Sequence, residues 1–141
     1  MPKQHKILRG KLVLKTKRDR DGKILKYKAR WVVKGFEQRY GKDYDQTFAG
    51  VCKSVTWKVA VVLAALFDLE IKQMDAVRAF LNSEADIEIY VEVPPGWKEG
   101  ETLLEDIPEW AYKLLKALYG LKQAPRLWQK KLRSALEELG F

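Results

Sequence analysis

Near the start of the chain, two stretches with the composition of β-strands flank an Asp-Gly pair, and this pattern constrains the fold more than any other feature. Residues 11–17 and 24–34 mix β-branched, aromatic and long basic side chains. Asp21-Gly22 favours a tight turn between them, because glycine readily adopts a positive φ. The sequence therefore predicts a two-stranded hairpin. The turn also resembles the start of a calcium-binding loop, but Arg30 stands where such a loop needs its glutamate, so we interpret it as a turn.

The basic charge of the chain is concentrated in this N-terminal part. Residues 1–35 hold 13 Lys and Arg side chains against two Asp, whereas the rest holds 14 against 17 acidic side chains, and the net charge is +8. A cationic ribbon suits the phosphate backbone of a nucleic acid, because phosphate contacts release counterions. The alternative is a solvated basic face without a specific partner.

Cysteine, histidine and hydropathy patterns exclude several function classes. The chain has one Cys, Cys52, and one His, His5, so an internal disulfide, a cysteine-based zinc site and a histidine cluster are excluded. The longest apolar run, from about Val59 to Phe67, is far shorter than the ~20 residues of a membrane span. Residues 1–17 lack the apolar core of a secretory signal. We therefore expect an intracellular protein that is not secreted and has no membrane partner.

Helical and alternating patterns follow the hairpin, so the expected fold class is α+β. Ser54 is placed to cap a helix that runs to about Phe67, and the wide apolar face of this helix predicts burial. In the loop expected at 36–53, Asp43 and Asp45 are a metal pair in principle, but a turn or cap role explains them better. The other expected elements are a strand at 69–74, a short helix at 78–82, a strand at 87–93 stopped by Pro94-Pro95-Gly96, an acidic loop at 97–110, a strand at 112–118 and a helix from Pro125 to Leu139, which Gly140 ends.

Two places carry residues suited to chemistry. Asp75 ends the strand expected at 69–74, where a carboxylate projects from a sheet edge and can bind a divalent cation; capping of the next helix is the alternative. Gly120, Lys122 and Arg126 lie at a loop-to-helix junction, where a small residue, two cations and free amide groups suit a phosphate. A turn followed by a capped helix explains the same residues without a ligand.

Five ordered blocks together resemble one protein family. They are Tyr27-Lys28-Ala29-Arg30-Trp31-Val32-Val33-Lys34-Gly35-Phe36, residues 40–49, Gln73-Met74-Asp75 with Ala79-Phe80-Leu81-Asn82, Val93-Pro94-Pro95-Gly96-Trp97, and residues 118–128 with Tyr119-Gly120-Leu121-Lys122-Gln123-Ala124-Pro125-Arg126. Their order and spacing, from about Leu12 to Phe141, are similar to those of the reverse transcriptases of Ty1/copia-type retrotransposons. The resemblance implies a fragment of a right-hand polymerase, with a basic β-hairpin of the fingers and a connector at 1–50 and an incomplete mixed palm sheet with helices at 51–141.

The resemblance also implies roles for individual residues, which we state as expectations. Asp75 matches the first catalytic aspartate, a ligand to both magnesium ions, and Ala76 offers its main-chain carbonyl to one of them. Phe80 matches the aromatic gate that excludes a ribose 2′-hydroxyl. The residues expected to bind the nucleotide are Arg30, Lys23, Ala76, Phe80, Tyr119, Gly120 and Lys122, and those expected to bind nucleic acid are Lys28, Lys34 and Arg126. The implied partners are an RNA or DNA template-primer, deoxynucleotides and the remainder of a Pol polyprotein, in a cytoplasmic particle or the nucleus.

The sequence departs from the family pattern at several positions. Ala76-Val77-Arg78 stands in place of the usual Val-Lys-Thr, Ser83 replaces a Gly, and Gly50 replaces a Pro. The family's second catalytic block, an Asp-Asp pair, has no counterpart in the sequence. One carboxylate of three does not hold two magnesium ions, so we expect this chain alone to be inactive. The alternatives are a non-catalytic basic module that binds nucleic acid and a structural remnant.

Overall fold

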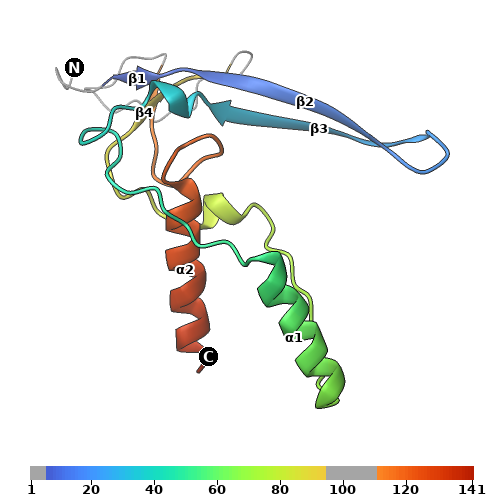
Figure 1. Cartoon of the computed structure of the whole chain (residues 1–141). Coiled ribbons are helices and arrows are strands. Elements are labelled where there is room, and N and C mark those ends of the chain that lie inside the picture. Colours follow the sequence, from blue (N-terminus) through green and yellow to red (C-terminus); the bar gives the residue numbers. More distant parts are fainter. Residues whose placement is uncertain (1–5, 95–110) are drawn as a thin grey trace.

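The structure is a computed structural model that describes residues 6–94 and 111–141. Its described elements are β1 (Ile7–Leu8), β2 (Gly10–Arg18), β3 (Ile24–Val33), the 3₁₀ helix η1 (Gly35–Glu37), α1 (Ser54–Leu66), the 3₁₀ helix η2 (Ala79–Asn82), β4 (Tyr90–Glu92), β5 (Ala111–Lys113) and α2 (Ala124–Glu138). In Figure 1 the β2–β3 ribbon projects to one side as a long arm, while α1 and α2 extend downward beneath it. Helices together with two separate sheets confirm the expected α+β class.

The predicted hairpin is confirmed. β2 and β3 pair antiparallel, starting with Gly10 opposite Val33 at the base of the ribbon. At its tip, the carboxylate of Asp19 accepts the main-chain N–H groups of Asp21 at 3.0 Å and of Lys23 at 2.8 Å. The aspartate therefore closes the turn, in agreement with the interpretation of this loop as a turn.

A second, three-stranded sheet has the order β1-β4-β5, with β1 parallel to β4 and β4 antiparallel to β5. β1 was not predicted, and the strands expected at 87–93 and 112–118 are limited to the three residues of β4 and of β5. The strand expected at 69–74 is wrong, since these residues have neither helix nor strand. A strand needs a hydrogen-bonded neighbour, and none of the described strands pairs with this segment. Pro95-Gly96 and the acidic loop at 97–110 lie outside the described residues.

The apolar helix occupies the expected place, but its predicted burial is wrong. Within α1 only Ala64 is buried, whereas Val55 and Leu66 are 69% and 71% exposed. Ser54 is the first helical residue, and the capping residue is Lys53, which makes no side-chain cap bond. The residues of the packed core come from other elements. Within the described part of the chain, the apolar face of α1 is therefore left largely uncovered. No helix in the described ranges combines the length and hydropathy needed to cross a membrane.

The core lies where the base of the ribbon, the three-stranded sheet and the start of α2 meet. α2 begins with Pro125 in its first turn and is followed by Gly140 at a φ of 86°, which confirms the predicted C-terminal helix. The short helix expected at 78–82 is confirmed as η2. The buried residues of the core come from both halves expected from the sequence, 1–50 and 51–141: Leu8, Val33, Ile89, Val91, Ala117, Leu121, Ala124 and Leu127.

Candidate nucleotide and nucleic-acid interface

The β2–β3 ribbon has one basic and one apolar face. Residues opposite each other in an antiparallel pair project from the same face, and faces alternate along each strand. The register therefore gathers on one side, here called the basic face, the cations Lys11, Lys15, Lys17, Lys26, Lys28 and Arg30. The opposite side carries Leu12, Leu14, Thr16, Tyr27, Ala29 and Trp31. Two residues expected to bind nucleic acid or nucleotide, Lys28 and Arg30, thus belong to one positive surface.

The cations of the basic face repel one another. The pKa of Lys28 lies below its ordinary value, chiefly because of the charge of Arg30 and next because of Lys17. No ion pair joins these six side chains to a carboxylate in residues 6–94 or 111–141. A row of phosphates would offset this repulsion, and salt would weaken the attraction because most of these side chains are exposed to solvent.

Three residues expected to contact the nucleotide come together at the base of the basic face. The guanidinium carbon of Arg30 lies 5.9 Å from the ring centroid of Tyr119. The rings of Tyr119 and Phe80 have centroids 5.1 Å apart at an interplanar angle of 59°. The three come from β3, η2 and the turn before α2, so folding joins segments that are distant in sequence. We call this set the Arg30–Tyr119–Phe80 cluster; a cation beside two rings suits a phosphate attached to a sugar and base.

The turn that carries Tyr119 lies tightly against the base of the ribbon. The main-chain N–H of Val33 donates to the carbonyl of Tyr119 at 2.8 Å. Gly120 has a φ of 96°, and a Cβ at this position would overlap the carbonyl oxygen of Val33 and stand 2.9 Å from Val32 Cγ1. From the other side, a Cβ on Gly35 would overlap the carbonyl oxygen of Gly120. Both glycines therefore allow two backbones to touch, which sets the position of Tyr119 relative to β3.

Lys122 connects this turn with the segment that follows η1. Its main-chain N–H donates to Gln38 Oε1 at 2.8 Å. Its Nζ donates to the main-chain carbonyl of Gln38 and to the hydroxyl of Tyr44, both at 3.3 Å, and lies 4.5 Å from the ring centroid of Tyr44. Among the described contacts, none joins the Lys122 ammonium to the Arg30–Tyr119–Phe80 cluster.

Behind the turn lies a buried polar network that the sequence pattern did not indicate. Gln38, Asp43 and Gln123 are 5%, 5% and 1% exposed. Gln38 Nε2 donates to Gln123 Oε1 at 2.9 Å and to the main-chain carbonyl of Asp43 at 3.2 Å, and Gln123 Nε2 donates to the same carbonyl at 3.0 Å. The signal that could have found it is the presence of an uncharged amide, Gln123, inside the block with Lys122 and Pro125.

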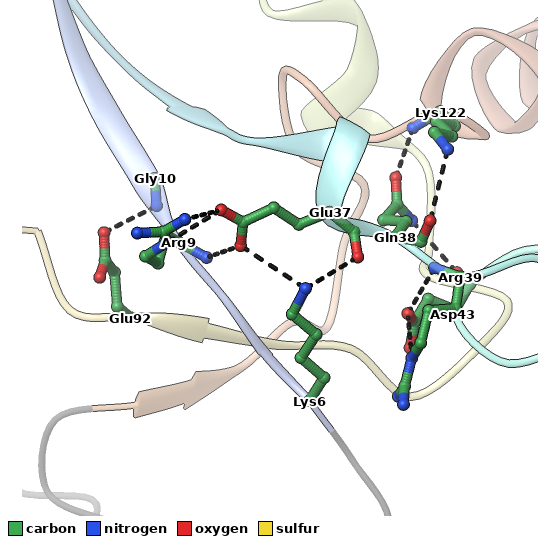
Figure 2. Close-up of polar contacts among 9 residues, drawn as sticks. All are labelled: Lys6, Arg9, Gly10, Glu37, Gln38, Arg39, Asp43, Glu92 and Lys122. Carbon is green, nitrogen blue, oxygen red and sulfur yellow. Dashed lines mark hydrogen bonds and ion pairs between the residues drawn. The ribbon is translucent and has the colours of Figure 1, made fainter.

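Asp43 closes a turn of the chain. Its carboxylate accepts the main-chain N–H of Arg39 at 2.7 Å and lies 3.3 Å from Arg39 Nε. This local bond closes the turn after η1, which agrees with the turn or cap role expected for the aspartate. Figure 2 shows Asp43, Gln38 and Lys122 side by side at this point.

A second group of polar contacts holds the start of β2 against η1 and β4. The carboxylate of Glu37 accepts Arg9 Nε at 2.8 Å and Arg9 Nη2 at 2.6 Å, and Lys6 Nζ lies 4.0 Å away (Figure 2). The hydrogen bond from Arg9 is the main cause that lowers the pKa of Glu37 below its ordinary value. On the other side, Glu92 accepts the main-chain N–H of Gly10 at 2.8 Å. These bonds orient the ribbon relative to the three-stranded sheet.

Asp75 and Ala76 lie exposed on the segment between α1 and η2. Within the part of the chain that the structure describes, no hydrogen bond or ion pair joins Asp75 to the Arg30–Tyr119–Phe80 cluster. Magnesium takes six oxygen ligands and commonly keeps waters, so one carboxylate and one main-chain carbonyl are compatible with two of its ligands. However, residues 6–94 and 111–141 contain no group of three or more His, Cys, Asp or Glu that could hold a metal. These residues alone do not fit a two-metal centre.

The remaining expected residues lie apart from the cluster. Lys23 belongs to the turn at the ribbon tip, seven residues from Arg30 and therefore roughly 20 Å away along the strand. Lys34 follows β3, and its main-chain N–H donates to the carbonyl of Arg9 at 2.8 Å. Arg126, in the first turn of α2, donates to Asp86 at 3.2 Å. Of the nucleotide residues expected from the sequence, Arg30 and Phe80 are thus the ones whose side chains contact the Tyr119 ring.

Comparison with known proteins identifies the family of the chain. The family described as reverse transcriptase (RNA-dependent DNA polymerase) matches residues 1–141, and the chain belongs to this family. No solved structure was found to match it.

The relatives are polyproteins of transposable elements. The chain is 43% identical over 137 residues to the retrovirus-related Pol polyprotein from transposon TNT 1-94 of Nicotiana tabacum, covering 97% of the chain and 10% of that protein. It is 39% identical over 141 residues to the retrovirus-related Pol polyprotein from transposon RE1 of Arabidopsis thaliana, covering 99% of the chain and 9% of that protein. The resemblance to Ty1/copia-type reverse transcriptases is confirmed, and the chain spans about a tenth of the length of these relatives.

Proposed function

We propose that the chain is the part of a retrotransposon RNA-directed DNA polymerase that holds the template-primer and the incoming deoxynucleotide. Residues 1–50 act as the fingers, with the basic face along the nucleic-acid backbone. Residues 51–141 act as the first part of the palm and carry Asp75 and Phe80. The remainder of a Pol polyprotein is the partner that completes the enzyme.

The observation that carries this proposal is the contact of Arg30 with Tyr119 and of Tyr119 with Phe80, next to the basic face. Arg30 would bind the triphosphate, since guanidinium groups pair well with phosphate oxygens. Phe80 would lie under the sugar, where a bulky ring leaves no room for a 2′-hydroxyl. Tyr119 contacts both residues, at 5.9 Å from the Arg30 guanidinium and 5.1 Å from the Phe80 ring, and so sets the spacing of the two.

The metal part of the proposal rests on Asp75. Its carboxylate and the carbonyl of Ala76 would be two oxygen ligands of a magnesium site, in which the metal would neutralise charge on the triphosphate. The described residues do not supply the further carboxylates that two metal ions need. We therefore propose that this chain alone does not extend a primer.

The nucleic-acid part can be tested with this chain directly. Fluorescence anisotropy with a labelled RNA–DNA hybrid measures the affinity of the chain for the hybrid at KCl concentrations from about 50 to about 200 mM. Replacing Lys15 and Lys28, which lie opposite each other on the basic face, by Gln should reduce the slope of log affinity against log salt by about 1.8, because each lost phosphate contact removes about 0.9. The matched control replaces Lys130 and Lys131 of α2 and should leave the slope unchanged. Equal effects of the two pairs would contradict a role of the basic face.

The catalytic part needs a Pol protein that contains this segment. Asp75→Asn should abolish primer extension without changing the affinity for the hybrid, because it removes a metal ligand and not a nucleic-acid contact. Phe80→Ala should keep extension but admit ribonucleotides. Extension that survives Asp75→Asn would refute the metal role.

A non-catalytic module that binds nucleic acid is the second candidate. It is favoured by the lack of a described carboxylate group around Asp75. Tight binding of the hybrid by the chain, together with no dependence of extension on Asp75 in the longer protein, would support it.

A further inference from the structure

The hydrogen-bond partners of Gln38 define how its amide is oriented. Its Oε1 accepts the main-chain N–H of Lys122 at 2.8 Å, and its Nε2 donates to the main-chain carbonyl of Asp43 at 3.2 Å. A main-chain N–H only donates and a carbonyl only accepts, so the oxygen and nitrogen of Gln38 are assigned without ambiguity. The same carbonyl accepts Gln123 Nε2 at 3.0 Å, which leaves Gln123 Oε1 to accept from Gln38 at 2.9 Å.

This network links the ribbon to the turn that carries Tyr119. Gln38 follows η1 directly after β3, and its main-chain N–H donates to the carbonyl of Gly35 at 3.1 Å. Gln38 therefore moves with the strand that bears Arg30. Through its side chain it holds Lys122 and Gln123, which are three and four residues after Tyr119. Both amides are buried, and each of their oxygen and nitrogen atoms has at least one hydrogen-bond partner within the chain.

We propose that Gln38 is a positioning residue that holds Tyr119 between Arg30 and Phe80. The inference rests on the proposed function for its consequence, since Tyr119 is proposed to contact the nucleotide through this arrangement. Gln38 touches neither ring and acts through the main chain of residues 119–123. Its loss should leave the ribbon and α2 in place but release Tyr119 from its contacts.

The substitution Gln38→Glu tests this role with a minimal change of shape. One oxygen of the introduced carboxylate still accepts from Lys122, but the other faces two acceptors, the Asp43 carbonyl and Gln123 Oε1. At pH 8 this repulsion should open the turn. At pH 5 protonation restores a donor to a buried carboxyl and should close the turn again. The nearby charged groups are the Lys122 ammonium and the Asp43 carboxylate, which is already paired with Arg39 at 3.3 Å.

The readout is the nuclear Overhauser contact between the rings of Tyr119 and Phe80, with far-UV circular dichroism to verify folding. In Gln38→Glu this contact should be lost at pH 8 and return at pH 5. The matched control is Gln129→Glu, because the Gln129 amide likewise accepts from a main-chain N–H and donates to a main-chain carbonyl, both of Gly50, at 2.9 and 3.1 Å. In Gln129→Glu the contact between the rings of Tyr119 and Phe80 should persist at both pH values. A contact that persists in Gln38→Glu at pH 8 would overturn the proposal.

Two further measurements keep the inference separate from the proposed function. In the unmodified chain, the side-chain amide protons of Gln38 and Gln123 should exchange slowly with solvent, and fast exchange would overturn the network even if every variant failed to fold. At pH 8, Gln38→Glu should weaken deoxynucleotide binding to the complex of the chain with the hybrid about tenfold, and Tyr119→Ala should cause no further loss in that background. If the unmodified chain does not bind the hybrid, the proposed function fails, while the ring contact still decides the role of Gln38.

Discussion

Replacing Gly120 by Ala should separate the turn that carries Tyr119 from the ribbon. Gly120 combines a φ of 96° with contact to β3, where a Cβ would overlap the carbonyl oxygen of Val33. Two costs follow. A left-handed backbone at a residue with a Cβ costs about 1 kcal/mol. The overlap forces the turn outward and breaks the 2.8 Å bond from the Val33 N–H to the Tyr119 carbonyl.

The second cost is the larger one. Val33 is 2% exposed, so its N–H would be left buried without a partner, which costs about 2 kcal/mol. Gly120→Ala should therefore lower the free energy of unfolding by about 3 kcal/mol in total. Gly22→Ala provides the matched control, because Gly22 has a φ of 84° and nothing within 4 Å of its Cβ position. It should lose about 1 kcal/mol, the conformational cost alone.

Urea denaturation followed by circular dichroism measures both losses. Gly35→Ala adds an independent check, since its Cβ would overlap the Gly120 carbonyl oxygen without a positive φ, and it should lose about 2 kcal/mol. If Gly120→Ala and Gly22→Ala lost the same free energy, the close contact between the turn and the ribbon would not exist in solution, and the position assigned to Tyr119 would be refuted.

Three other substitutions test local features by urea denaturation. Ser83→Ala should raise the free energy of unfolding by about 1 kcal/mol, because the Ser83 hydroxyl is buried without a described partner, and Ser134→Ala on the exposed part of α2 should not. Arg78→Gly should raise it by up to about 1 kcal/mol, because Arg78 has a φ of 54°; a loss instead would mean that the left-handed residue is not strained. The contribution of Glu37, whose pKa is lowered, should be present above about pH 5 and disappear as the pH falls through its folded-state pKa, so the gap between the unmodified chain and Glu37→Gln should shrink from pH 7 to pH 3; a constant gap would contradict the ion pair.

Local patterns predicted the parts of the fold that depend on neighbours in sequence. The hairpin follows from Asp21-Gly22 between two strand-like stretches, and α2 follows from Pro125 and Gly140 at its ends. The ordered blocks predicted the family, and through it they predicted that Arg30, Phe80 and Tyr119 bind the nucleotide. That the three residues meet in one place depends on the tertiary fold, which no local pattern reports.

The wrong predictions share one physical cause. A sequence pattern indicates that a segment can bury an apolar face, but it does not indicate whether another element is present to cover that face. The apolar face of α1 predicted burial, yet only Ala64 is buried. The segment 69–74 has strand-like composition but no described strand beside it. The burial of the Gln38 and Gln123 amides was not predicted, because polar side chains are usually exposed and become buried only where each finds a hydrogen-bond partner.

The role proposed for the basic face depends on the register of the hairpin. A shift of one residue would move every side chain to the other face, so that Trp31 in place of Arg30 would approach Tyr119. Two features oppose such a shift. The carboxylate of Asp19 closes the turn at one end, and at the other end Gly10 leaves room for the ring of Trp31, which a Cβ would overlap. Neither the turn nor the glycine belongs to the Arg30–Tyr119–Phe80 cluster, yet they decide which cation reaches it.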